Sequence, residues 1–116
     1  MDIKDFLGTL IFHFERGKLS YESYLKSGNN FLYARILKDN NSAIKKLLLS
    51  NGHILPTDLK QDALQILAHL DVWHELWDDL KHQLEPSLND VFIFQNDHSF
   101  PKDSEKALIY FFNSLE

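Results

Sequence analysis

The longest regular pattern in this chain is the recurrence of apolar residues from Leu59 to Leu84, at alternating spacings of four and three residues. The apolar positions are Leu59, Ala63, Ile66, Leu70, Trp73, Trp77, Leu80 and Leu84. This spacing returns side chains to one face of a helix, and no strand could keep all of them on one buried face. Because Pro56 precedes the pattern and Pro86 follows it, we predict one long helix over about residues 58–85.

Two shorter helical patterns occupy the N-terminal part of the chain. Apolar residues at helical spacing predict a helix over about residues 2–16, and Gly17 is expected to end it. Ser20 can cap a short second helix, which the SGNN stretch at 27–30 ends. We therefore expect a break near Gly17 and a turn at 27–30.

The rest of the chain contains further helical patterns and one exception. The DNNS stretch at 39–42 predicts a break between two helices, and Gly52 is expected to close the second of them as a C-terminal cap. The VFIF run at 91–94 favours β structure but has no second run of similar quality to pair with. We expect an extended segment there, laid over the helices, before Pro101 opens a final helix.

Composition supports a single helical domain over residues 1–116. Hydrophobic residues make up 44% of the chain and aromatic residues 13%, which is enough for one buried core. We predict an all-α bundle of about five helices around the long helix at 58–85, with a short extended segment near 91–94. No run of eighteen apolar residues is present, so no membrane span is expected. The absence of cysteine excludes thiolate chemistry and disulfides, and it favours a cytoplasmic location.

Charge divides the chain into two halves of opposite sign. Residues 1–57 hold eight Lys and Arg and five Asp and Glu, a balance of +3, whereas residues 58–116 hold four and twelve, a balance of -8. The acidic half should repel phosphate and attract basic surfaces, so we expect no duplex nucleic acid as a partner. A basic cluster lies in the other half, at Arg35, Lys38, Lys45 and Lys46. It could touch a phosphate backbone, or contact the acidic half of its own fold or of a second copy.

The long helix contains HELWDDLKH at 74–82, which is one residue away from the zinc-protease signature H-E-x-x-H. A zinc site there would use His74 and Asp78 as ligands and Glu75 as a base, but no other His lies in a third-ligand motif. At about 100° per residue, these side chains instead form a polar flank beside the apolar seam. This acidic stripe consists of Asp71, His74, Glu75, Asp78 and Asp79. We interpret it as a solvated or protein-binding face and expect no metal.

No stretch of the sequence has the spacing of a catalytic motif. The four glycines are too scattered for a phosphate-binding loop or a nucleophile elbow. Ribonucleases of the all-helical HEPN type are similar in size and class, but they carry an Arg with a His shortly after it. Neither Arg16 nor Arg35 is followed by such a His. We therefore expect a protein that is not an enzyme, with no catalytic residue and no cofactor.

The small, acidic, cysteine-free and aromatic-rich character of the chain resembles that of the small immunity and antitoxin proteins of bacteria. The resemblance covers overall character and no diagnostic motif, so it assigns no residue. It implies a non-catalytic domain that binds and neutralises a basic toxin such as a nuclease. We expect the acidic stripe to be the docking face, because carboxylates on a rigid helix speed association with a basic partner. Two alternatives are a homo-oligomerising structural subunit and a metal-dependent hydrolase at His74, Glu75 and Asp78.

Overall fold

The structure, a computed structural model, describes residues 1–95 and 98–115. Within these residues the chain forms four α-helices, one short 3₁₀ helix and no strand beyond a single isolated bridge. The elements are α1 (Ile3–Lys26), α2 (Phe31–Asn51), η1 (Gly52–Ile54), α3 (Thr57–Leu84) and α4 (Lys102–Asn113). The sequence-based prediction of an all-α bundle is therefore confirmed, with fewer α-helices than the expected five.

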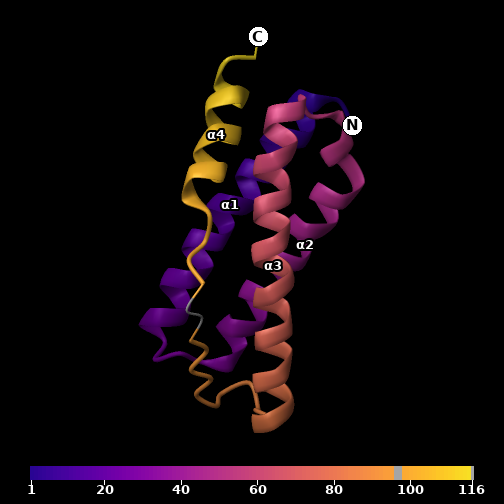
Figure 1. Cartoon of the computed structure of the whole chain (residues 1–116). Helices are drawn as coiled ribbons and strands as arrows, with labels where there is room; N and C mark the ends of the chain where they lie inside the picture. Colours follow the sequence, from indigo (N-terminus) through magenta and orange to yellow (C-terminus); the bar gives the residue numbers. More distant parts are fainter. Residues whose placement is uncertain (96–97, 116) are drawn as a thin grey trace.

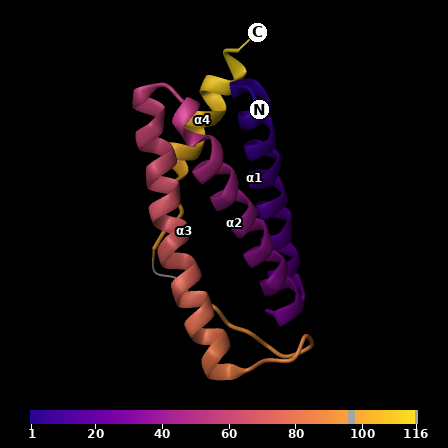
Figure 2. The same cartoon turned by 90° about the vertical axis from the view of Figure 1, so that its right-hand side faces the viewer.

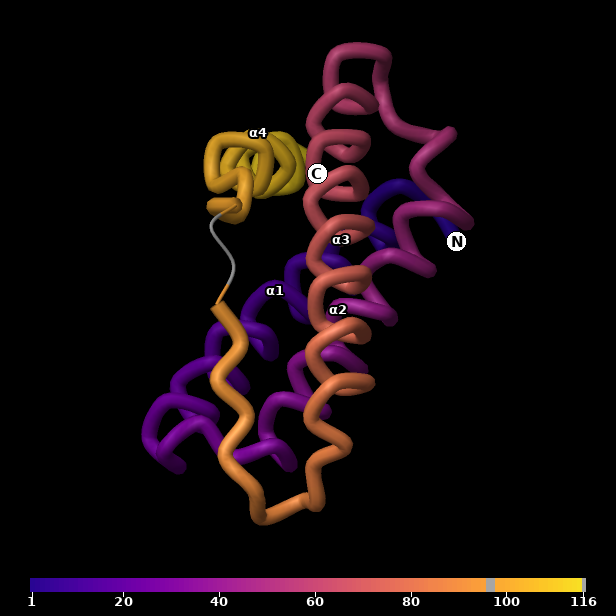
Figure 3. Tube along the Cα trace, turned by 60° about the horizontal axis from the view of Figure 1, so that its bottom comes forward, coloured from indigo at the N-terminus to yellow at the C-terminus, as the bar shows by residue number. Residues whose placement is uncertain are grey.

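The helices form an elongated bundle with principal extents of 45 × 23 × 22 Å. Helices α1 and α2 pair as a hairpin, and α3 packs against α2 (Figure 1, Figure 2). Helix α4 contacts both α1 and α3, so it covers one end of the bundle. Residues 86–95, which follow α3, run back along the other end (Figure 3).

Helix α3 matches the predicted long helix to within one residue at each end. Its seam is buried at Ala63, Ile66, Leu70 and Trp77, partly buried at Leu59, Trp73 and Leu80, and exposed at Leu84. The seam ends at Leu84 because the bundle ends there, and Glu85 follows in the left-handed conformation with φ 44°. The heptad pattern therefore identifies the face of α3 that enters the core.

The predicted break at Gly17 and the short helix from Ser20 are both wrong, because α1 continues unbroken to Lys26. Gly17 lies against α2, and a Cβ atom built on it would lie 3.0 Å from Nδ2 of Asn40. A glycine weakens a helix by only about 1 kcal/mol. Gly17 thus serves close helix packing, not helix termination.

The predicted break at 39–42 is also wrong, because α2 runs through these residues. The buried side chain of Asn40 explains why the helix does not break there. Its Nδ2 donates to the carbonyl oxygen of His13 at 2.9 Å, and its Oδ1 accepts from Nδ1 of His13 at 3.1 Å. Arg16 Nη1 also donates to this oxygen, at 3.3 Å. A turn-forming residue has become the polar link between two helices. The helix ends at Asn51, as expected, but Gly52 has an ordinary helical φ of -58°.

The core consists of two separate clusters of buried side chains. The first cluster contains Phe6, Leu7, Leu10, Phe14, Ile44, Leu48, Leu55, Ala63, Ile66, Leu70 and Leu108. The second cluster contains Tyr24, Phe31, Ala34, Trp77 and Phe92. The first draws on all four α-helices, whereas the second draws Phe92 from the extended chain between α3 and α4.

Backbone and side-chain hydrogen bonds fasten the segment at 86–94 to the turn between α1 and α2. The amide of Phe31, at the start of α2, donates to the carbonyl of Asp90 at 2.9 Å, and the amide of Phe92 donates to Asn29 at 2.7 Å. The Tyr24 hydroxyl donates to the carbonyl of Phe92 and accepts from the amide of Phe94. The bond of the Phe31 amide satisfies a polar group at the start of α2, which has no earlier helical turn to bond with.

Candidate functional site

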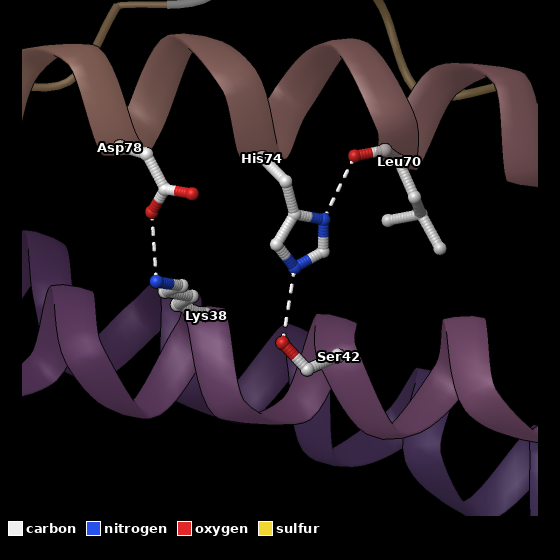
Figure 4. Close-up of polar contacts among 5 residues, drawn as sticks. All are labelled: Lys38, Ser42, Leu70, His74 and Asp78. Atoms are coloured by element: carbon white, nitrogen blue, oxygen red, sulfur yellow. Dashed lines mark hydrogen bonds and ion pairs between the residues drawn. The ribbon is translucent and has the colours of Figure 1, made fainter.

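The acidic stripe of α3 lies against α2, and the two helices are joined there by a ladder of polar contacts. Its rungs are Lys45 Nζ to Asp71 Oδ1 at 2.6 Å, Ser42 Oγ to His74 Nε2 at 3.1 Å, and Lys38 Nζ to Asp78 Oδ1 at 2.7 Å. The members are spaced by three and four residues on each helix, so each set lies on one helical face. Figure 4 shows two of the rungs, with α2 and α3 running side by side. We call these six residues the polar ladder.

His74 has a defined tautomer in the polar ladder. Its Nδ1 lies 2.8 Å from the carbonyl oxygen of Leu70, one turn earlier on α3 (Figure 4). Because a carbonyl oxygen only accepts, Nδ1 carries the proton and Nε2 faces the Ser42 hydroxyl. In the neutral ring the hydroxyl donates to Nε2. The nitrogen that would bind a cation is therefore already engaged.

Asp78, the other half of the suggested ligand pair, accepts a hydrogen bond from Lys38 through its Oδ1 (Figure 4). The Lys38 ammonium also lies 4.6 Å from the centre of the Trp77 ring, a cation–π distance. Among the residues that the structure describes, no three His, Asp or Glu side chains are grouped as a metal site. The geometry gives the metal-hydrolase alternative no support.

The acidic stripe is split into anchored and free members. The side chains of Asp71 and Asp78 are 58% and 56% exposed although each has a lysine partner. Glu75 and Asp79 are exposed, and neither forms an ion pair within the described part of the chain. His74 is partly buried between the helices. Sequence reasoning placed all five beside the seam but did not show that three of them face α2.

The basic cluster of α2 explains why some members of the acidic stripe form ion pairs and others do not. Lys38 and Lys45 contact the acidic half of the same chain, which is one of the interpretations that the charge pattern had left open. Lys46 is exposed beside them and lines a shallow groove of about 710 Å³ between α2 and α3, together with Glu75. The groove therefore has charged walls of both signs.

A second feature, a cavity of about 660 Å³, lies between α1, α2, α3 and the start of α4, with Phe94 and Phe100 from the chain before α4. Its walls include seven Phe, Tyr and Trp residues, namely Phe14, Tyr21, Tyr24, Trp73, Trp77, Phe94 and Phe100. Trp73 stacks on Trp77 with ring centres 6.4 Å apart and meets Phe94 edge-on at 5.3 Å. This cavity could not be predicted from the sequence, because its walls come from separate segments and no single periodicity connects them.

His69 forms part of the cavity wall, with its ring 5.4 Å from that of Phe100 in an edge-on arrangement. Burial lowers the pKa of His69 below its ordinary value of 6.5, and the nearby His98 lowers it further. Desolvation and a second positive charge both disfavour the protonated ring. At neutral pH His69 is therefore an uncharged part of the wall.

No protein family, curated protein or solved structure matches this chain. Within the described residues, no helix combines the length and the apolar character needed to cross a membrane.

Proposed function

We propose that this chain is a non-catalytic, cytoplasmic protein-binding domain of the immunity or antitoxin type, which docks a basic toxin through the acidic stripe. The observation that carries the proposal is the position of Glu75 and Asp79. They are exposed about one turn apart on the longest helix, with no ion pair among the described residues. They are flanked by Asp71 and Asp78, which the polar ladder holds in place.

This arrangement suits the capture of a basic surface. Carboxylates on a packed helix lose little conformational entropy on binding, and they attract a cationic partner before contact. The ladder lysines offset the charge of Asp71 and Asp78, so Glu75 and Asp79 supply the uncompensated charge of the stripe. They are therefore the residues on which the association rate should depend most.

The test compares association rates with the purified product of the neighbouring reading frame, since immunity proteins are encoded beside their toxins. The variant is the pair Glu75→Lys and Asp79→Lys. The control pair, Glu15→Lys and Glu22→Lys, makes the same charge change at exposed positions on α1. Reversal of Asp71 is avoided because it would set two lysines against each other at Lys45.

We expect the stripe variant to associate about tenfold more slowly than the wild type at low salt, and the difference to shrink at high salt. The control variant should associate at a rate much closer to that of the wild type. A folded stripe variant with an unchanged association rate would place the interface elsewhere. Thermal melting of each variant shows whether it is folded.

Homo-oligomerisation remains the second candidate, because α3 also exposes apolar side chains. Leu64, Val72 and Leu76 are 54%, 42% and 39% exposed. Burial of such side chains between two copies of α3 would be favourable. Light scattering separates the two functions, since a binder of the proposed type is monomeric alone and a structural subunit is not.

A further inference from the structure

The aromatic cavity lies at the junction of the two core clusters, and its deep walls are apolar. Phe14 and Leu70 belong to the first cluster, and Tyr24 and Trp77 to the second, yet all four line the cavity. Its volume of about 660 Å³ falls in the range of small-molecule sites, roughly 300 to 1,000 Å³. The two clusters therefore leave between them a space large enough for a ligand.

Two buried polar side chains of the cavity wall, Tyr24 and Asn40, already have partners. The Tyr24 hydroxyl is bonded to Phe92 and Phe94. The amide group of Asn40 is bonded to His13 on both its oxygen and its nitrogen. A ligand body in this space would meet aromatic and aliphatic surface, so it should itself be apolar.

The residues of the cavity wall that carry charge are mainly basic. They are Lys18, Lys102, Lys106 and Glu105. Lys18 Nζ lies 3.3 Å from Oε1 of Glu105, so the single carboxylate is already paired. Lys102 and Lys106 are exposed and form no ion pair with any described residue. These two lysines can therefore receive an anionic group.

We propose that the cavity binds an anionic amphiphile, a small molecule with an apolar body and one negatively charged head. The body stacks among Trp73, Phe94 and Phe100, and the head lies at Lys102 and Lys106. Aromatic walls favour flat or flexible apolar bodies, and the ammonium groups select a carboxylate over a neutral or cationic head. This site lies apart from the acidic stripe, so it goes beyond the proposed docking function.

Tryptophan fluorescence provides a direct test, because Trp73 and Trp77, the chain's two tryptophans, both line the cavity. The probes are laurate, dodecanol and dodecyltrimethylammonium, which each have a straight chain of twelve carbons and differ in the head. Laurate and dodecyltrimethylammonium are used below their critical micelle concentrations, and dodecanol below its solubility limit. Calorimetry with 2-naphthoate distinguishes a flat aromatic body from a flexible one. We expect saturable binding of one laurate per chain, at least about tenfold tighter than that of dodecanol.

Double substitutions test whether Lys102 and Lys106 cause the preference for laurate over dodecanol. Lys102→Gln with Lys106→Gln should weaken laurate about tenfold and leave dodecanol unchanged. The control, Lys4→Gln with Lys81→Gln, removes the same charge at exposed positions away from the cavity and should bind laurate like the wild type. Asn41→Phe, on the cavity wall, should weaken laurate and dodecanol alike by filling the space. The melting temperature of each variant shows that it is folded.

Two results would overturn the proposal. One is that neither laurate nor 2-naphthoate binds saturably to the wild-type protein. The other is that dodecanol binds as tightly as laurate and the Lys102 and Lys106 pair has no effect, because the cavity would then not select an anion.

Discussion

The two core clusters differ in the type of side chain that they contain and in the segments that supply those side chains. The first is mainly aliphatic, and helices supply nearly all of it, including Leu10 and Ile66. The second is mainly aromatic and depends on Phe92, which comes from chain without helical structure (Figure 3). Helical periodicity can create the first kind of core by itself. The second kind also needs hydrogen bonds that fix the path of an extended segment, and these are the bonds of Tyr24 and Asn29.

The largest loss of stability should come from removal of the Trp77 ring, which lies at the centre of the second cluster. Trp77 is 1% exposed and contacts Phe31 and Phe92 at ring distances of 5.8 Å and 5.1 Å. Trp77→Ala should lower the free energy of unfolding by about 3 to 5 kcal/mol, because it leaves a large cavity among rings that cannot close it. Urea denaturation followed by circular dichroism measures this loss.

Trp73→Ala is the matched control, since it makes the same change four residues earlier on the same helix. Trp73 is only partly buried whereas Trp77 is fully buried, so removal of the Trp73 ring should destabilise the protein less. Equal losses for the two variants would mean that Trp73, like Trp77, is a central residue of the second cluster.

A smaller effect should follow from Tyr24→Phe, which keeps the ring and removes the hydroxyl. The carbonyl of Phe92 and the amide of Phe94 then lose their shared partner. We expect a loss of about 1 to 2 kcal/mol and faster amide hydrogen exchange at Phe94, with exchange in the first cluster unchanged. Tyr21→Phe is the control, because Tyr21 is exposed on the same helix. Uniformly faster exchange would show that the two clusters unfold as one unit.

Helix α3 could be predicted from the sequence because its own residues carry the pattern that buries it. The continuity of α1 through Gly17 and of α2 through Asn40 could not be predicted, since both residues are turn formers by local preference. In the fold they meet each other across the contact of two helices. Tertiary packing overrides a local preference of this size, and one sequence read along its length does not reveal which helices will be neighbours.

The acidic stripe and the aromatic cavity were also only partly predictable, because they too depend on which segments become neighbours. The angular position of Asp71 and Asp78 beside the seam followed from helix geometry, but their lysine partners lie on another helix. The aromatic cavity could not be predicted from helix geometry at all, because Phe14, Trp73 and Phe100 are brought together from three parts of the chain. Composition showed that aromatic residues were abundant. It could not show that some of them would surround a space instead of filling it.

The smallest expected change in stability comes from the protonation of His69, which lies beside the cavity between the two clusters. Its pKa is lowered in the folded protein by burial and by the positive charge of His98. Below about pH 6.5 the unfolded chain therefore takes up a proton that folded His69 resists, so stability falls as the pH decreases from 6.5 towards the folded pKa. Above pH 6.5 this group contributes no pH dependence. Unfolding in urea from pH 7.5 to pH 5 should show a shallower decline for His69→Gln than for the wild type. The same substitution at exposed His82 on α3 should leave the wild-type decline in place. If His69→Gln keeps the full decline, another group causes it, and the wall of the cavity is not the place where protonation opposes folding.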